Sequence, residues 1–370
     1  MKRCSEHKQI RIEEIPCQEI SNPAVLSKNP LVSVKMLTYN HEQYIPQAIE
    51  GVLIQKTDFP IELIVGEDRS TDYTREIVLK HQKKYPEIIR VITSEKNVGA
   101  WRNSLRTGNA CRGKYIAFCE GDDYWTDPYK LQKQVDYLEK HPECGLVHSD
   151  VDRYYVKEGI KIKSYHKNRM IPNNNGESIL KAIILYDYIV ETCTAVVRKD
   201  LLNEIHKTCH FEFSENFLMG DIQTWTEIAY RSKIKYMNEV LATRNLLAES
   251  ACRSSDIDRQ IRFLRNSRAI HLHYANKYGG VHSTDLEKSI IDRVDRELIN
   301  LACRIRKPEL ARELLVNLKK YQIPLDKVSY FHLIGSQKAV TFYLVKFLVL
   351  PIRVSRKIIR VLCSLLESKF

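Results

Sequence analysis

Three acidic residues, Glu120, Asp122 and Asp123, lie within four positions directly after the apolar segment 115–118. That segment reads Tyr-Ile-Ala-Phe and has no polar alternation, which is typical of a strand covered on both faces in a parallel sheet. Carboxylates this close repel each other unless a cation lies between them. Hard divalent cations such as Mg²⁺ and Mn²⁺ take carboxylate oxygens and commonly share them with a phosphate. The motif indicates a cation site, with a solvated acidic loop or a helix cap as the alternative.

Strand and helix patterns alternate around this motif. We expect strands at residues 31–37, 61–65, 88–92, 115–118, 145–148, 194–197 and 234–241, and helices at residues 43–54, 72–85, 101–111, 130–140 and 221–232. A polar, turn-like stretch is expected at 151–175, and a charge-rich helical region from about 255 to 317. The fold class is therefore α/β, with a mostly parallel sheet and helices on both faces.

Polar residues follow the predicted strands at their carboxyl ends, where ligands bind in sheets of this kind. Thr38, Tyr39 and Asn40 follow the first strand, Glu67 and Asp68 follow the second, and the acidic motif follows the fourth. Because parallel strands end at the same edge of a sheet, these groups are expected to meet there. Ser70, Thr71 or Asp72 is expected to cap the helix that follows the second strand.

Composition narrows the class of protein. The chain has 370 residues, 44% hydrophobic content and a net charge of +12, which suits a globular protein with a phosphate-bearing, nucleic-acid or anionic-membrane partner. The ten cysteines form no CxxC pair, and they favour a reducing, cytoplasmic compartment. The N-terminus lacks the apolar region of a secretory signal, and no apolar run of about 20 residues predicts a membrane-spanning helix.

Four motifs together resemble those of family 2 glycosyltransferases with the GT-A fold. They are Ser-Val-Lys-Met-Leu-Thr-Tyr-Asn at 33–40, Glu-Asp-Arg-Ser-Thr-Asp at 67–72, Glu-Gly-Asp-Asp at 120–123 and Met-Gly-Asp at 219–221. The resemblance covers about residues 31–247 and points toward bacterial enzymes of surface-polysaccharide assembly. It implies transfer of a sugar from a nucleotide-diphosphate donor, a UDP-sugar by expectation, to an acceptor hydroxyl with inversion at the sugar carbon.

The resemblance also implies roles for individual residues. The residues expected to bind the donor are Thr38, Tyr39, Asn40, Glu67, Asp68, Asn97, Gly99 and Asp122. Asp68 is expected to accept a hydrogen bond from a uracil N–H. Asp123 is the expected ligand of Mn²⁺ or Mg²⁺, with Asp122 beside it at the metal or the ribose. Asp221 is the expected general base, and a cap of the following helix is its alternative role.

The chain departs from the family pattern at three of these positions. Arg69 stands where the family usually has Gly, and either touches a phosphate or points to solvent. Glu120 replaces a common Asp, and Gly220 replaces the Glu that usually precedes the base. Trp125 is expected either to stack on a sugar ring or to fill the core. Ser250 and Arg253 follow the last predicted strand and are weaker candidates for a loop that closes over the diphosphate.

The domain organisation follows from these patterns. We expect a polar, irregular extension at 1–30, a GT-A domain at 31–250, a helical subdomain at 251–335 and a basic amphipathic helix at 336–370. The last helix either packs on the protein or lies on an anionic membrane surface at the inner face of the cell membrane. A saccharide or lipid-linked saccharide acceptor agrees with the second possibility.

Two other classes of protein compete with this interpretation. A nucleotidyltransferase would also use carboxylates and a metal, but its Gly-rich, basic signature near the first strand is absent from the sequence. A non-catalytic, basic nucleic-acid-binding protein would interleave basic and aromatic residues on one element, and no such pattern is found. We therefore expect no nucleic-acid partner. The sequence does not specify the donor sugar, whether hexose or N-acetylhexosamine, the acceptor or the linkage.

Overall fold

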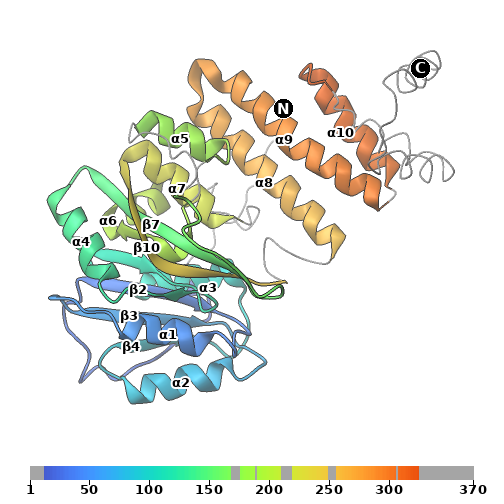
Figure 1. Cartoon of the computed structure of the whole chain (residues 1–370). Helices are drawn as coiled ribbons and strands as arrows, with labels where there is room; N and C mark the ends of the chain where they lie inside the picture. Colours follow the sequence, from blue (N-terminus) through green and yellow to red (C-terminus); the bar gives the residue numbers. More distant parts are fainter. Residues whose placement is uncertain are drawn as a thin grey trace, which may run out of the picture. The chain divides into compact units, whose positions relative to one another are not determined.

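A computed structural model of the chain describes residues 12–167, 176–187, 190–209, 219–248, 256–305 and 307–324. Within these residues one sheet of ten strands runs in the order β1-β4-β3-β2-β5-β9-β7-β10-β6, with β8 paired to β7 (Figure 1). The strands are β1 (Gln18–Ile20), β2 (Val32–Thr38), β3 (Ile61–Glu67), β4 (Ile89–Thr93), β5 (Tyr115–Phe118), β6 (Tyr124–Trp125), β7 (Cys144–Tyr155), β8 (Ile160–Ile162), β9 (Val196–Arg198) and β10 (Lys233–Leu246).

The strands β4, β3, β2 and β5 are mutually parallel, as is the pair β7 and β10. The chain runs outward from β2 to β3 and β4, and then returns to the other side of β2 to form β5. The connections therefore diverge between β2 and β5. In open α/β sheets such a switch point opens a crevice at the carboxyl ends of the strands, which is where ligands bind.

Helices cover both faces of the sheet (Figure 1). One face packs against α1 (Ile45–Leu53), α2 (Thr74–Lys84) and α4 (Lys130–Lys140). The other face packs against α3 (Ala100–Ala110), α5 (Gly176–Ile184), α6 (Lys199–Thr208) and α7 (Gly220–Arg231). The predicted α/β fold with helices on both faces is confirmed, but the sheet is mixed, with four parallel pairings and five antiparallel ones among the described strands.

The local sequence explains why the predicted elements form. In α1 the residues Ile45, Ala48, Ile49 and Val52 are all buried, at the spacing that places them on one face of a helix. Every residue of β4 is buried, as expected for a central strand covered on both faces. The α4 helix spans the predicted residues 130–140.

Several short elements depart from the predictions. Residues 18–20, expected to be irregular, form β1 and pair antiparallel with β4. The expected polar stretch from residue 151 onward instead continues β7 to Tyr155 and then forms β8. The helices α5 and α6 and the two-residue strand β6 were not predicted. The expected side-chain cap of α2 is also wrong, because the N-cap position is Tyr73 and carries no such bond, although Asp72 accepts the Thr74 N–H at 3.0 Å.

The described residues divide into two compact units. The first holds the sheet and its helices together with Ala269–Gly280, and the second holds Asp256–Arg268 and the described residues from Val281 onward. The helices α8 (Ile257–Tyr278), α9 (Ser283–Arg304) and α10 (Pro308–Lys320) supply the predicted helical region. The helix expected at 336–370 lies outside the described residues. Among the described helices, none is both long enough and apolar enough to span a bilayer.

A buried ionic network ties the amino-terminal half of the sheet together. Glu62 on β3 is 1% exposed and accepts hydrogen bonds from Ser33 on β2, from Arg90 on β4 and from Arg112 before β5. Arg90 also bonds Glu19 on β1 through two nitrogens, each at 2.8 Å. Although burial opposes it, the bonds from Arg112 and Ser33 hold the pKa of Glu62 below its usual value. The network therefore needs an ionised Glu62.

We predict that Glu62→Ala lowers the free energy of unfolding by about 3 kcal/mol or more, because two guanidinium groups lose a shared buried carboxylate. Urea unfolding followed by circular dichroism measures the loss. Glu239→Ala is the matched control, since Glu239 pairs with Lys133 and their side chains are 52% and 35% exposed. An exposed pair of this kind typically contributes less than about 1 kcal/mol. Equal losses in the two variants would contradict the assignment.

Candidate active site at the carboxyl edge of the sheet

The tips of β2, β3 and β5 meet, as the sequence predicts. The Gly121 N–H donates to Leu37 O at 2.9 Å, and the Asp68 N–H donates to Thr38 O at 3.2 Å. A Cβ atom at Gly121 would lie 2.6 Å from Thr38 Oγ1, so only glycine allows the acidic turn to approach β2 this closely. The three predicted polar segments therefore lie side by side at the switch point.

The acidic turn is held from a distant strand. The Asn245 backbone N–H on β10 donates to Asp123 Oδ1 at 2.8 Å, and the Asn245 side chain donates to Asp122 O at 2.6 Å. The strand β6, which follows the turn, pairs antiparallel with β10 through Tyr124 and Trp125. This pairing fixes both aspartates against a rigid element.

Burial makes the carboxylates of this turn unusual. Loss of water and the neighbouring Asp122 charge raise the pKa of Glu120 to about 7. The same two effects raise the pKa of Asp123, which is 7% exposed, well above its usual value. The Oε2 atom of Glu120 is buried without a hydrogen-bond partner. The carboxylates repel one another, little water is present to screen them, and one oxygen has no hydrogen-bond partner. A bound cation would relieve all three costs.

The residues of the turn fit a hard divalent cation. Asp122 and Asp123 supply carboxylate oxygens, the preferred ligands of Mg²⁺ and Mn²⁺. The unused Glu120 Oε2 and the buried, unpartnered Oδ1 of Asn245 are further oxygen acceptors beside them. Within the described ranges no three His, Cys, Asp or Glu side chains form a metal-binding group by themselves.

Asp221 lies in the first turn of α7 and does not cap that helix. The N-cap position is Met219, which forms no side-chain cap bond, and Asp221 Oδ1 accepts only the neighbouring Ile222 N–H at 2.9 Å among its described bonds. The surrounding protein removes enough water to raise the pKa of Asp221, although solvent still reaches its side chain. Asp221 also contributes to the raised pKa of Glu120, so the two carboxyl groups share one electrostatic environment.

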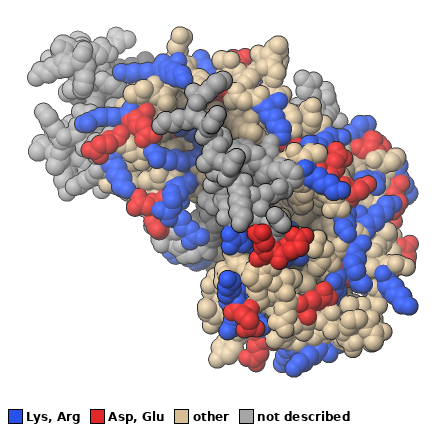
Figure 2. All heavy atoms as spheres, turned by 180° about the vertical axis from the view of Figure 1, so that it is seen from behind, with Lys and Arg blue, Asp and Glu red and all other residues tan. Residues whose placement is uncertain are grey.

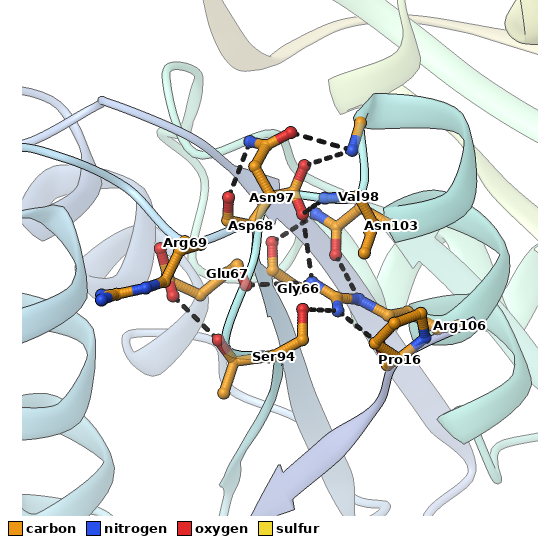
Figure 3. Close-up of polar contacts among 12 residues, drawn as sticks. Pro16, Gly66, Glu67, Asp68, Arg69, Ser94, Asn97, Val98, Asn103 and Arg106 are labelled. Carbon is orange, nitrogen blue, oxygen red and sulfur yellow. Dashed lines mark hydrogen bonds and ion pairs between the residues drawn. The ribbon is translucent and has the colours of Figure 1, made fainter.

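Asp68 directly follows β3 and holds the turn at residues 97–99, which follows the neighbouring strand β4 (Figure 3). Its two carboxylate oxygens accept the N–H groups of Val98 and Gly99 at 2.8 and 2.9 Å. Asn97 donates back to Asp68 O at 2.7 Å, and Gly99 has a φ of 86°, a conformation that favours glycine. The predicted residues Asp68, Asn97 and Gly99 are thus brought together. Their observed contacts shape the turn, and the expected uracil contact stays a prediction.

Arg106 on α3 anchors this turn and was not among the predicted residues. It is buried, and its guanidinium donates to Glu67 O at 3.1 Å, to Asp68 Oδ1 at 3.3 Å and to Ser94 Oγ at 2.6 Å. Figure 3 shows it reaching from α3 toward the tip of β3. Arg106 lies 38 residues after Asp68 in the sequence, so no pattern near Asp68 points to it.

Glu67 is a correction to the predicted donor site. Its side chain is completely buried, and its carboxylate accepts bonds from the Ser70 N–H at 2.6 Å, from Arg75 at 3.1 Å and from Thr93 at 3.0 Å. A donor has no surface of Glu67 to contact. The residue instead fixes the loop that follows β3.

The residues at the tip of β2 differ in their freedom to bind a donor. Tyr39 is 43% exposed, so its ring is available for stacking. Asn40 has a φ of 56°, and its Oδ1 accepts the Thr71 N–H at 2.8 Å. Thr38 is buried, and its hydroxyl lies 3.3 Å from Nδ1 of His41. Tyr39 therefore offers the largest free surface of the three.

The structure decides between the two alternatives for Trp125 and adds a contact for Arg69, whose proposed role stays a prediction. Trp125 is a core residue, because it is buried and its Nε1 donates to Cys193 O at 2.7 Å. Arg69 has a φ of 59°, which explains why glycine suits this position, and its Nε donates to Glu95 O at 3.2 Å. Ser250 and Arg253 lie outside the described residues.

A second ionic group, also missed from the sequence, borders the acidic turn. Glu191 is buried and accepts bonds from Arg244 on β10 and from Arg153 on β7, the latter through Nε at 2.8 Å. Although burial opposes it, these two guanidinium groups hold the pKa of Glu191 below its usual value. Arg244 also opposes the rise in the pKa of Glu120, Asp123 and Asp221.

Comparisons with known proteins agree with this geometry. The profile described as "Glycosyl transferase family 2" matches residues 33–205. The putative teichuronic acid biosynthesis glycosyltransferase TuaG of Bacillus subtilis is 38% identical over 222 residues, which is 60% of this chain and 81% of TuaG. The uncharacterized protein Rv1520 of Mycobacterium tuberculosis is 43% identical over 130 residues. That match spans 35% of this chain but only 37% of Rv1520.

A solved structure supports the fold. The crystal structure of S. aureus TarS matches with a TM-score of 0.50 and 18% identity, covering 82% of this chain and 55% of TarS. At this level of identity the likeness concerns the fold alone.

We predict that the affinity of the protein for Mn²⁺ rises as the pH increases from about 5.5 to about 7.5. Below its pKa of about 7, Glu120 carries a proton that opposes the cation, and this proton is lost as the pH rises. If one proton leaves per cation, the affinity should change by up to about tenfold per pH unit below the pKa. Electron paramagnetic resonance of free Mn²⁺ measures the binding. Glu120→Gln should reduce the pH dependence, with the raised pKa of Asp123 supplying what remains. A pH-independent wild-type affinity would exclude this coupling.

Proposed function

The chain belongs to glycosyl transferase family 2, and from this membership we propose that it transfers a sugar from a nucleotide-diphosphate donor to an acceptor hydroxyl with inversion. The observation that carries the proposal is the acidic turn at the switch point of the sheet, with the helix that carries Asp221 packed nearby through the contact of Trp225 on α7 with Phe118 at the end of β5. A desolvated acidic turn, clamped to β2 and β10, shares its electrostatic environment with Asp221 at the start of α7. The acidic turn is suited to binding a cation and a diphosphate, and Asp221 is suited to accepting a proton.

The donor diphosphate is proposed to lie at the acidic turn. Asp123 would hold Mn²⁺ or Mg²⁺, with Asp122 beside it. The bound cation would compensate the negative charge that develops on the departing nucleoside diphosphate. The protein itself fixes the Asp123 carboxylate and the Asp122 backbone through the bonds from Asn245, and it excludes water from Asp123 by burial.

Asp221 is proposed to accept the proton of the attacking acceptor hydroxyl. A general base needs an ionised carboxylate that the substrate can reach, and the Asp221 side chain is open to solvent at the helix start. Loss of water raises its pKa, which makes it a stronger proton acceptor than an ordinary aspartate.

The tip of β2 is proposed to bind the base of the nucleotide. The exposed Tyr39 ring offers a stacking surface, and Asp68 directly follows the adjacent strand β3. We propose a UDP-sugar as the donor, with a hexose or an N-acetylhexosamine as the transferred group. Preference for uridine would require the uracil N–H to reach Oδ2 of Asp68, which is 2% exposed and accepts only the Gly99 N–H among its described bonds. A panel of nucleoside diphosphates tests it directly.

The acceptor is proposed to be a saccharide or lipid-linked saccharide in polysaccharide assembly. The name of the B. subtilis relative, which refers to teichuronic acid biosynthesis, supports this class of acceptor. A cytoplasmic site at the inner face of the membrane would suit such an acceptor, with the basic segment 336–370 as the proposed membrane contact.

The competing nucleic-acid-binding function has little support from the face of the protein drawn in Figure 2. On the face drawn in Figure 2, the described Lys and Arg side chains are interspersed with Asp and Glu. An electrostatic footprint for a nucleic acid would gather basic residues on one face or along one helix. The acidic turn at the edge of the sheet would also repel a phosphate backbone. Family membership likewise disfavours a nucleotidyltransferase.

Ligand binding provides the first test. We expect UDP and Mn²⁺ together to raise the thermal unfolding midpoint of the protein by more than either does alone, because each completes the binding site of the other. The same measurement with GDP and ADP tests the base preference, and an oligonucleotide tests the competing class. Stabilisation by the oligonucleotide alone would overturn the proposed function.

Catalysis provides the second test. We predict that Asp221→Asn lowers kcat by about 100-fold or more while the fold is retained, since a general base typically contributes 10² to 10⁴. Asp123→Asn should abolish turnover and weaken Mn²⁺ binding. The rate is measured as nucleoside diphosphate released from a panel of nucleotide sugars.

Asp200→Asn is the matched control for the catalytic test. Asp200 lies in the first turn of α6, and its Oδ1 accepts the next N–H, of Leu201, at 2.8 Å, as Asp221 does in α7. It should leave kcat unchanged. Near-normal turnover in Asp221→Asn would show that another group is the base.

A further inference from the structure

Arg244 is attached to the most firmly held part of the site. The next residue, Asn245, is bonded to the acidic turn through its backbone N–H and its side chain, at 2.8 and 2.6 Å. The preceding residue, Thr243, pairs with Tyr124 directly after that turn. The backbone of Arg244 is therefore fixed beside Asp122 and Asp123.

The partner of Arg244 is also fixed relative to the acidic turn. Arg244 Nη1 donates to Glu191 Oε2, and Glu191 is buried directly before the short helix Thr192–Thr194. That helix is tied to the turn because Trp125 Nε1 donates to Cys193 O at 2.7 Å. It is tied to α4 because Gln134 donates to Thr194 O at 2.8 Å. The guanidinium therefore has a defined place at the edge of the acidic turn.

Arg244 and Arg153 share one carboxylate and differ in their exposure to solvent. Glu191 is one carboxylate serving two guanidinium groups, those of Arg244 and Arg153, with His166 Nε2 4.0 Å from it. Arg153 lies deeper, with a 12% exposed side chain stacked 3.4 Å from the centre of the Tyr165 ring. Arg244 is 32% exposed and is the member of the pair that solvent reaches more readily.

The positive charge of Arg244 acts both on the acidic turn and on Asp221, the proposed base. It opposes the rise in the pKa of Glu120 and Asp123 at the turn and of Asp221 on α7. A positive group in this position would attract an anion placed between these elements. A guanidinium can keep one bond to a carboxylate while presenting its other N–H groups to a phosphate.

We propose that Arg244 binds the diphosphate of the donor, as a protein-borne positive group beside the cation. The inference rests on the proposed function, because it assumes a nucleotide-diphosphate donor at the acidic turn. Arg244 then contacts the phosphates directly, and Glu191 holds it in place. The Arg244 guanidinium then neutralises part of the negative charge that develops on the departing nucleoside diphosphate.

Comparison of UDP with uridine tests the proposal, since the two ligands differ only in the diphosphate. Binding is measured by isothermal titration calorimetry, with Mn²⁺ and separately with EDTA. Arg244→Gln should weaken UDP by about 10- to 100-fold in both conditions, the size expected for a lost charged hydrogen bond, and leave uridine unchanged. Arg244→Lys should recover part of the loss.

Arg153→Gln is the matched control, because it also removes one of the two guanidinium groups on Glu191 but from the deeper position. It should leave the ratio of UDP to uridine affinity at the wild-type value. An equal drop of the ratio in both variants, or an unchanged ratio in Arg244→Gln, would overturn the assignment. If Arg244→Gln does not fold, Arg244→Lys decides: a lowered ratio supports the proposal and a wild-type ratio overturns it.

The wild-type protein separates this proposal from the proposed function. If it binds no uridine nucleotide, the same pairs are measured with GDP and guanosine and with ADP and adenosine. Failure of every nucleoside diphosphate would overturn the proposed function and this inference together. Binding of a diphosphate by the wild type, with no specific loss in Arg244→Gln, would overturn this inference alone.

Discussion

The electrostatic cost of holding several carboxyl groups together in a desolvated turn governs the design of the site. Glu120, Asp122 and Asp123 are forced together by the sharp turn at Gly121, which lies against Thr38 too closely for any side chain. Burial and mutual repulsion raise the pKa of Glu120 and Asp123. Such a turn would relax into solvent unless the fold held it. The clamp from Asn245 and the pairing of β6 with β10 provide that restraint.

The topology of the sheet places this restrained turn where it can be used. Because the chain leaves β2 in one direction and returns to form β5 on its other side, the tips of β2 and β5 flank the switch point. The long strand β10 then reaches the same edge from the distant end of the sheet, carrying Arg244 and Asn245. The site therefore combines one locally encoded acidic motif with cationic and amide groups that only the folded sheet supplies.

Most regular elements were predictable from the sequence, and the exceptions share a physical reason. The helix α1 carries its burial pattern in its own residues, so periodicity finds it. The strand β1 has three residues with little burial, and its pairing with β4 is reinforced by the ion pair of Glu19 with Arg90, 71 positions away. Elements that depend on partners distant in sequence leave no local pattern to read.

The same distinction applies to the candidate site. Asp122 and Asp123 were found because strand, turn and charge lie together in one segment. Arg244 was missed because its partner Glu191 is 53 positions away, and Glu67 was placed at the donor because sequence alone does not show its burial. The Asp68 turn was found as a group of residues, but its internal bonds to Val98 and Gly99 follow only from the fold.

The cation at the acidic turn is the central claim, and anomalous diffraction tests it most directly. Crystals soaked with Mn²⁺ and UDP should show one manganese peak in contact with the Asp123 carboxylate and with the phosphates of UDP. Manganese and UDP bound elsewhere, with Asp122 and Asp123 turned away from both, would contradict it.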